Sequence, residues 1–264
     1  KILCAGAAAM LLAACGSGNS TQQTVSGLNP ADFDSTINGK QTHLVTIKNS
    51  KGMEVCLTNY GGRVVSISIP DKNGKMTDVV CSYDNIHQYA DTLNSPSDYG
   101  SSVGRYANRI KNAKLTVAGK TYNLRANDNG NCLHGGGNTG WMHKVYDIKE
   151  LTDSSVVFAI TSPDGDNGFP GTVSATAKYT VKSDNPIDIV FEGSTDKETV
   201  INMTNHSYFN LNGDPSKPGD NMVAYINADK FTPADSLYIR TGEIRSVDGT
   251  PMDFRKPHAL ADHI

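Results

Sequence analysis

Short runs of alternating or β-branched residues recur along the chain, and this pattern restricts the fold more than any other feature. Examples are HLVTIKN, MEVCLTNY, RVVSISIP, SSVVFAIT and GTVSATAKYTV. Gly, Asn, Asp and Pro separate the runs, as turns between strands require. Only DNIHQYADTL (84–93) is compatible with a short helix. Because strands do not alternate with helices, a doubly wound sheet or a TIM barrel is disfavoured. The pattern predicts an all-β protein built as a large antiparallel β-sandwich.

The first 35 residues differ in composition from the rest. Residues 2–14 form an apolar run (ILCAGAAAMLLAA), which is typical of a secretory signal peptide and shorter than the ~20 residues that a membrane-spanning helix needs. The run ends in LAAC, which resembles a bacterial lipobox with Cys15 as the lipidated residue; plain secretion is the alternative. Residues 15–35 are polar and rich in Gly, Ser and Thr, as in a flexible tether.

These features predict a signal peptide over 1–14, a tether over 15–35 and one β-sandwich domain over 36–264. We expect an exported protein on the periplasmic or outer side of a bacterial membrane, which contacts the membrane only through its N-terminal lipid.

Charge and cysteine content argue against several classes of partner. The chain has 24 Lys and Arg against 27 Asp and Glu, and no basic block that could follow a phosphate backbone, so a nucleic-acid partner is not expected. Beyond the first 15 residues, Cys56, Cys81 and Cys132 form an odd number, which predicts no disulfide framework. No Cys or His spacing of the zinc-site type occurs, so we predict no metal site.

Three generic motifs match the chain and are rejected on context. GGGNTG (135–140) fits GxGxxG, but no strand precedes it and no helical pattern follows. GSSVG (100–104) fits GxSxG without the strand and helix that a nucleophile elbow needs. DGDNG (164–168) begins like a calcium loop, but it has Gly at the fifth position and no acid at the twelfth, so a turn explains it.

Polar side chains stand among glycines and apolar residues in four separate clusters. GRYANRI (104–110) supplies Arg and Asn groups that suit sugar hydroxyls or carboxylates. Alternatively, one of the two arginines could simply be a surface residue, and we expect this of Arg105 rather than of Arg109. LHGG (133–136) sets His134 beside glycines that would let a ligand approach the backbone, although a lone histidine is often structural.

The other two clusters contain His206 and Asp253. NMTNHSYFNL (202–211) surrounds His206 with amides and hydroxyls that can fix its tautomer. TPMDFR (250–255) sets Asp253 between bulky apolar groups, where it needs donors or a shifted pKa; a salt bridge to Arg255 is the simpler explanation. Two histidines with Arg, Asn and Asp indicate a polyol site with general acid and base capacity.

In this order, seven segments resemble the aldose 1-epimerases of the galactose mutarotase family. They are NYGGRVVSI, GRYANRI, LHGG, SPDGDNGFPG, TNHSYFNL, TPADSLYIRTGE and GTPMDFR. The resemblance implies a β-supersandwich and the interconversion of the α and β anomers of free aldoses such as galactose and glucose. It implies a monomer that needs no cofactor, while a structural calcium ion stays open.

The resemblance also implies roles for single residues. Asn108 and Arg109 match the sugar-binding pair, and Asp253 matches a carboxylate that binds sugar hydroxyls. His134 matches the first active-site imidazole, and His206 matches the proton donor to the ring oxygen.

The chain departs from the family pattern at its end. The family's general base is a Glu beyond the PxDFR motif, and no acid of this chain takes that role by motif, so we expect a C-terminally truncated chain. A carbohydrate-binding lipoprotein without proton transfer is therefore an alternative, and an epimerase of phosphorylated hexoses is a weaker one. Trp141 is an open candidate for stacking on a sugar, with a core position as its other explanation.

Overall fold

The computed structural model describes residues 23–94 and 97–263. The predicted signal peptide and Cys15 lie outside the described residues. Within them, every helix is too short or too polar to cross a membrane.

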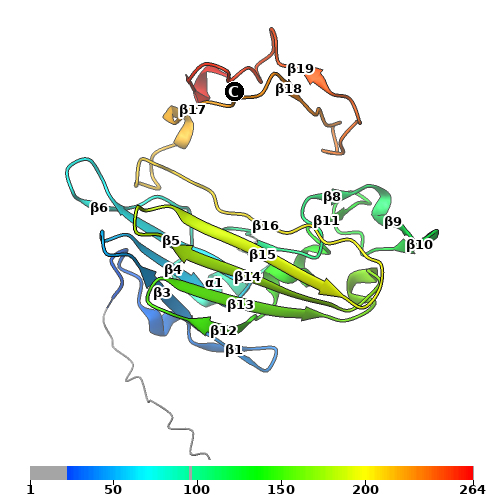
Figure 1. Ribbon diagram of the computed structural model, residues 1–264, viewed down its shortest axis with the longest axis horizontal. Coiled ribbons are helices and arrows are strands. Elements are labelled where there is room, and N and C mark those ends of the chain that lie inside the picture. Colours follow the sequence, from blue (N-terminus) through cyan, green and yellow to red (C-terminus); the bar gives the residue numbers. More distant parts are fainter. Residues whose placement is uncertain (1–22, 95–96, 264) are drawn as a thin grey trace, which may run out of the picture.

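Two four-stranded antiparallel sheets form the body of the molecule (Figure 1). The first has the order β3 (Leu44–Lys48), β4 (Glu54–Thr58), β5 (Arg63–Pro70) and β6 (Met76–Asp78). The second has the order β12 (Asp147–Leu151), β13 (Ser155–Ser162), β14 (Val173–Val181) and β15 (Ile187–Thr195). In both sheets each strand pairs with the next one along the chain, as the turn-separated runs predict.

One hydrophobic core joins the two sheets. Burial alternates along β13 and β14, so that every second side chain, such as Phe158 and Tyr179, points into the core. The same cluster contains Ile47, Val55 and Leu57 from β3 and β4. The predicted all-β sandwich is thereby confirmed.

Strands β4 and β5 are buried on both faces because a second cluster covers their outer side. Cys56 and Val65 pack there with Phe33, Ile86 and Tyr89. Phe33 comes from η1 (Pro30–Phe33). Ile86 and Tyr89 come from α1 (Ile86–Ala90), the helix expected within 84–93.

The folded part begins earlier than predicted. Residues 24–35 were assigned to a flexible tether, but Leu28 and Phe33 are buried and η1 packs on the sheet. Asn29 caps η1, and the Leu28 N–H donates to Thr24 Oγ1 at 2.9 Å. Composition hid this because two apolar side chains suffice to anchor a polar segment.

Short elements complete the described fold. The remaining strands form two-stranded pairs: β1 (Ser35–Ile37) with β2 (Lys40–Thr42), β7 (Ser102–Val103) with β16 (Thr204–Asn205), β8 (Arg109–Ile110) with β11 (Cys132–Leu133), β9 (Lys114–Val117) with β10 (Lys120–Asn123), β17 (Val223–Ala224) with β20 (His258–Ala259), and β18 (Lys230–Phe231) with β19 (Arg245–Ser246). The remaining 3-10 helices are η2 (Lys111–Ala113), η3 (Gly137–Thr139), η4 (Trp141–His143), η5 (Asp166–Gly168), η6 (Gly219–Asn221) and η7 (Leu260–Asp262).

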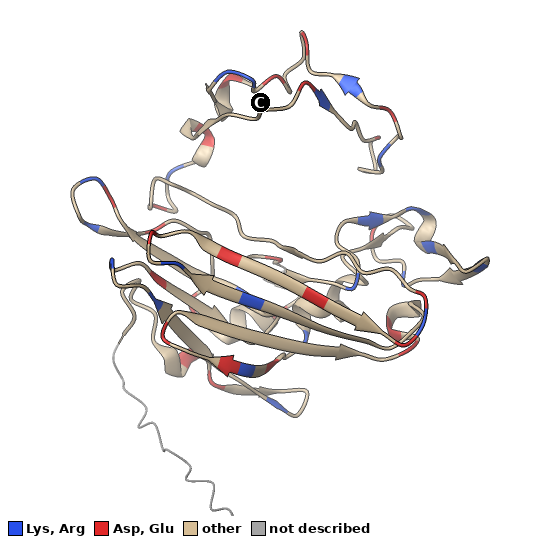
Figure 2. Ribbon diagram, viewed as in Figure 1, with Lys and Arg blue, Asp and Glu red and all other residues tan. Residues whose placement is uncertain are grey.

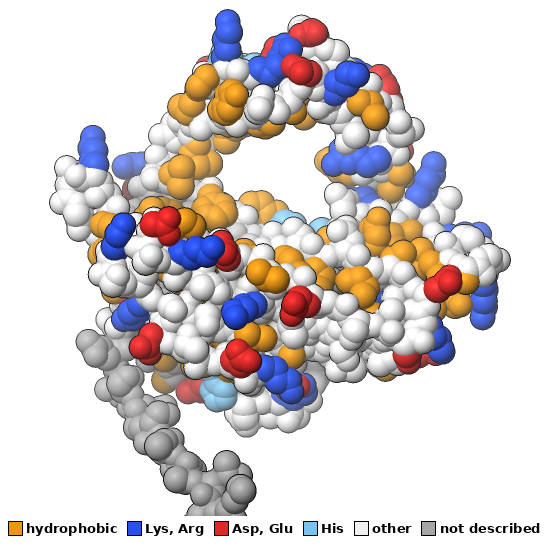
Figure 3. Space-filling view, in the orientation of Figure 1, with side chains coloured by type: hydrophobic (Ala, Val, Ile, Leu, Met, Phe, Trp, Pro, Cys, Tyr) orange, Lys and Arg blue, Asp and Glu red, His pale blue; other side chains and the backbone are white. Residues whose placement is uncertain are grey.

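Residues 223–263 form a C-terminal arm that stands away from the two sheets (Figure 1). The space-filling view shows an opening between the arm and the body (Figure 3). Hydrophobic side chains of the arm are exposed, among them Tyr225, Tyr238 and Ile244. Acidic and basic residues are interspersed over the sheets and the arm (Figure 2).

Candidate active site

Two short strand pairs carry the predicted histidines to one place. β11 pairs with β8, so that Leu133 lies opposite Arg109, and His134 follows at the end of β11. β16 pairs with β7, so that Asn205 lies opposite Ser102, and His206 follows at the end of β16. The two imidazole rings meet edge to face, with centroids 5.2 Å apart and planes at 89°.

Backbone hydrogen bonds fix His134 against Asn108. The Asn108 N–H donates to His134 Nδ1 at 3.0 Å, and the His134 N–H donates to the Asn108 carbonyl at 3.1 Å. A nitrogen that accepts an N–H bond carries no proton, so the neutral ring of His134 carries its proton on Nε2.

His206 is held by the segment that leads into β7. Its N–H donates to the Ser101 carbonyl at 2.9 Å, and its carbonyl accepts from the Gly100 N–H at 3.1 Å. The side chain of the preceding Asn205 donates to the Gly100 carbonyl at 2.8 Å. The amide-rich motif around His206 therefore orders the backbone that presents the ring. The imidazole ring of His206 packs on the ring of Tyr208, with centroids 5.2 Å apart.

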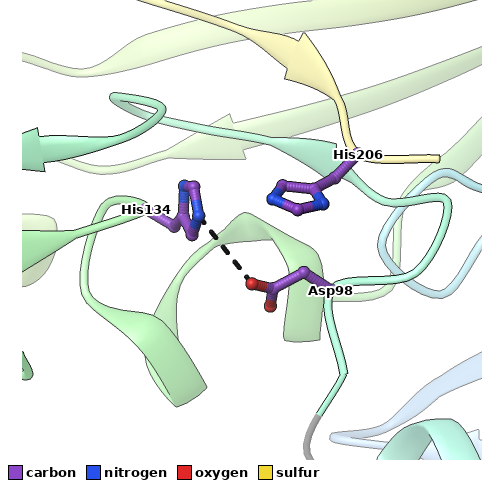
Figure 4. A group of neighbouring side chains, drawn as sticks. All are labelled: Asp98, His134 and His206. Carbon is purple, nitrogen blue, oxygen red and sulfur yellow. Dashed lines mark ion pairs between the residues drawn. The ribbon is translucent and has the colours of Figure 1, made fainter. Parts of the chain in front are cut away.

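Asp98 is a site residue that the sequence analysis missed. Its carboxylate and a ring nitrogen from each of His134 and His206 all lie within 4.8 Å of one another. The Asp98 Oδ2 atom is 3.8 Å from His134 Nε2. Figure 4 shows the three side chains converging from three segments of the chain. In the sequence, Asp98 stands in a turn-like SPSDYG segment that no pattern separates from an ordinary turn.

A polar cavity opens over the two imidazoles. Its volume is about 510 Å³, and it is lined by Ala107, Asn108, His134 and residues 202–208. This size lies in the range of small-molecule sites, and its lining of imidazole, amide and hydroxyl groups suits a polyhydroxylated ligand.

The surroundings of His134 favour its neutral form. Burial is the main cause, and it lowers the pKa of His134. The nearby His206 and Arg109 side chains lower this pKa further, whereas the Asp98 carboxylate raises it. A neutral His134 with its proton on Nε2 offers a hydrogen-bond donor to a ligand oxygen.

Asp98, His134 and His206 are also the group of side chains, among the described residues, whose ligand atoms lie close enough together to hold a metal ion. A metal would need the lone pair of His134 Nε2, but the Asn108 N–H places the ring proton on that nitrogen. The donor set therefore fits a hydrogen-bonded organic ligand better than a metal ion.

The other predicted site residues lie farther from the histidines or are engaged elsewhere. Arg109 bonds to Asp128 at 2.6 Å, and its guanidinium lies 4.9 Å from the ring centre of Tyr238 on the C-terminal arm. Asp253 belongs to the arm and does not line the cavity. Both of its oxygens accept from Arg255, at 2.9 and 2.6 Å, which lowers the pKa of Asp253 to about 2. The salt bridge proposed as the simpler explanation for Asp253 is present.

Comparison with known proteins agrees with this geometry. The family model described as aldose 1-epimerase matches residues 43–264. The chain belongs to the aldose 1-epimerase family. The aldose 1-epimerase of Escherichia coli K12 is 36% identical over 223 residues, which cover 84% of this chain and 63% of that protein. The galactose mutarotase of Bos taurus is 35% identical over 215 residues, which cover 81% of this chain and 61% of that protein.

A solved structure supports the same family. An aldose epimerase homologue from C. elegans superposes with a TM-score of 0.78 at 32% identity, over 84% of this chain and 66% of that one. The chain spans less than two thirds of the length of the curated relatives it matches.

Within this aldose 1-epimerase family member, Arg105 is a structural residue, and its assignment to the surface was wrong. It is 1% exposed, and its guanidinium donates to the carbonyls of Ser162, Pro163, Pro170 and Gly171. Local sequence gives no sign of this, because the acceptors lie 57 or more residues away.

The family motif LHGG uses its glycine for the protein's own packing. A Cβ atom on Gly135 would lie 2.5 Å from the Gly104 carbonyl oxygen, and its φ is +70°. We expected a ligand to use this close approach, but the backbone of residues 104–105 does. Trp141 belongs to the core at 1% exposure and packs over Gly104, so it offers no stacking face to a sugar.

Proposed function

We propose that this protein is an isomerase, an aldose 1-epimerase that interconverts the α and β anomers of free hexoses such as galactose and glucose. The observation that carries the proposal is the meeting of His134 and His206 at one polar cavity. Family membership supports the same reaction.

The reaction needs one group that gives a proton and one that takes a proton. Loss of the anomeric hydroxyl proton and protonation of the ring oxygen open the ring to the aldehyde. The C1–C2 bond rotates, and the reverse transfers close the ring on the other face. Each such group contributes about 10²–10⁴-fold in rate. No electron transfer or group transfer occurs, so we propose that the chemistry uses no cofactor.

We propose that His206 gives the proton to the ring oxygen and takes it back on ring closure. His134, neutral with its proton on Nε2, donates a hydrogen bond to the sugar from its fixed position on Asn108. Asn108 and Arg109 bind hydroxyls at the rim of the site. Asp253 can accept a hydroxyl while bonded to Arg255, because each carboxylate oxygen has a further lone pair.

Polarimetry of freshly dissolved α-D-galactose and α-D-glucose tests the proposal. The purified protein should shorten the approach to the equilibrium rotation compared with buffer alone. Calorimetric titration with the same sugars separates the two candidate functions. Sugar binding without acceleration would favour the carbohydrate-binding alternative, and neither binding nor acceleration would reject a hexose ligand.

We also propose that the protein is a monomer, exported and anchored through a lipid on Cys15. The support for export and for the lipid anchor is the apolar run that ends in LAAC, and the support for a monomer is the family resemblance alone. Labelled palmitate should enter the protein and should be lost in a Cys15→Ala variant. Equal labelling of both proteins would reject Cys15 as the anchor.

A further inference from the structure

We infer that Tyr179 is a positioning residue for His206 and acts on it through the side chain of Asn205. The inference rests on the proposed function and deepens it, because it extends the machinery of the site into the core. Tyr179 lies on β14, is buried in the core and does not line the cavity.

The Tyr179 hydroxyl is a buried polar group that bonds to both of the strands that present His206. Strands β7 and β16 pair with Ser102 opposite Asn205. The hydroxyl lies 2.7 Å from Ser102 Oγ and accepts from Asn205 Nδ2 at 3.2 Å. It also donates to the Gly62 carbonyl at 3.0 Å. Because burial raises the pKa of Tyr179, the hydroxyl keeps the proton that it donates. One side chain of β14 therefore ties the strand pair to the core.

The amide of Asn205 has one orientation that satisfies its partners. Nδ2 donates to the Gly100 carbonyl at 2.8 Å and to the Tyr179 hydroxyl at 3.2 Å, and Oδ1 accepts from the Ser207 N–H at 3.1 Å. A rotated amide would set Oδ1 against the Gly100 carbonyl and Nδ2 against the Ser207 N–H, and both contacts would be repulsive. The Tyr179 hydroxyl supplies one of the three bonds that hold the correct orientation.

The Asn205 side chain in turn fixes the backbone on both sides of His206. By accepting from Ser207, its Oδ1 atom closes a turn around His206. Its Nδ2 atom binds the carbonyl of Gly100, whose own N–H donates to the His206 carbonyl at 3.1 Å. This backbone sets where the imidazole meets the ring oxygen of a bound sugar, and a displacement of about 1 Å can cost about 10²-fold in rate. Tyr179 can thus affect proton transfer without touching the sugar.

Polarimetry and calorimetry on Tyr179→Phe test the inference. The substitution removes one oxygen atom and keeps the ring, which packs on Phe158 with centroids 6.2 Å apart. We expect kcat to fall by about 10–10²-fold. The Kd for galactose should change little, because the hydroxyl bonds to Ser102, Gly62 and Asn205, none of which is proposed to bind a sugar hydroxyl. Unchanged kcat in Tyr179→Phe would overturn the inference.

Tyr89→Phe is the matched control for the loss of a buried hydroxyl. Tyr89 is 1% exposed, and its hydroxyl accepts from the Tyr83 N–H at 3.0 Å in the cluster on the outer side of β4 and β5. Both variants should lose stability in urea, but only Tyr179→Phe should lose kcat. Equal losses of kcat in the two variants would mean that Tyr179 contributes only to stability, and the inference would fail.

A double-variant cycle tests the route through Asn205. If Tyr179 acts through this side chain, Asn205→Ala should have the same kcat with and without Tyr179→Phe, because coupled residues are not additive. Two losses that multiply in the double variant would show that the residues act independently and would overturn the route.

Nitrogen-15 NMR separates the inference from the proposed function. The ring resonances of His206, identified by their absence in His206→Asn, should shift or broaden in Tyr179→Phe, while those of the exposed His87 stay unchanged. Unchanged His206 resonances would overturn the inference whether or not the protein is active. A lack of acceleration by the unchanged protein would instead reject the proposed function, and the NMR comparison would still decide whether Tyr179 orders His206.

Discussion

The backbone N–H of Asn108 donates to Nδ1 of His134 at 3.0 Å. This bond decides which ring nitrogen carries the proton and sets His134 apart from His206. The Asn108 side chain was predicted to bind sugar, and its backbone has this second role.

The first prediction concerns the protonation of His134. Because burial lowers its pKa, more than half of His134 should be neutral at pH 6.5, the usual histidine pKa. The proton of the neutral ring should be on Nε2. Nitrogen-15 NMR of the histidine side chains measures both properties. A proton on Nδ1 of the neutral ring would contradict the hydrogen bond from Asn108.

Arg105 provides a test of stability without a role in the chemistry. Arg105→Ala leaves several buried acceptors without a donor, including Ser162 Oγ, which accepts at 2.7 Å. We expect the free energy of unfolding to fall by at least about 3 kcal/mol, since each unpaired buried group costs about 1–3 kcal/mol. Urea unfolding measures the loss. The exposed Arg125→Ala serves as control and should change stability little, and an equal effect of both substitutions would show that Arg105 is not a structural centre.

His143 predicts a loss of stability in acid. Burial, followed by the nearby Arg63, lowers its pKa to about 4. Its ordinary pKa is about 6.5, so between these pH values the unfolded chain binds a proton that the folded chain does not. The free energy of unfolding should therefore decrease as the pH is lowered from 6.5 to 4, by up to about 1.4 kcal/mol per pH unit from this residue.

Urea unfolding of the unchanged protein and of His143→Gln at several pH values isolates this effect. Gln can still accept from the Tyr60 hydroxyl, which lies 3.2 Å from His143 Nδ1. The variant should lose less stability between pH 6.5 and 4. Parallel curves for the two proteins would mean that His143 is protonated in the folded state.

The sequence predicted the sheets because their burial has a local signature. Strand β14 alternates buried and open positions, and that alternation is visible in GTVSATAKYTV. The end of the tether was misplaced because the burial of Phe33 comes from tertiary packing with Tyr89 of α1, which the local sequence does not encode.

The candidate site was predictable to the extent that single motifs carry it. His134 and His206 stand in distinctive clusters, and the structure brings them together. Asp98 joins them only through the β7–β16 pairing, which no local pattern encodes. The two arginines of GRYANRI look alike in sequence, and only the distant acceptors of Arg105 separate them.

The rate of anomer interconversion in His206→Asn tests the central claim most directly. Asparagine keeps a polar side chain in the cavity but cannot give a proton to the ring oxygen of the sugar. Polarimetry with α-D-galactose should show kcat reduced by about 10²–10⁴-fold, while the exposed His87→Asn keeps the rate of the unchanged protein. An undiminished rate in a folded His206→Asn would contradict the account.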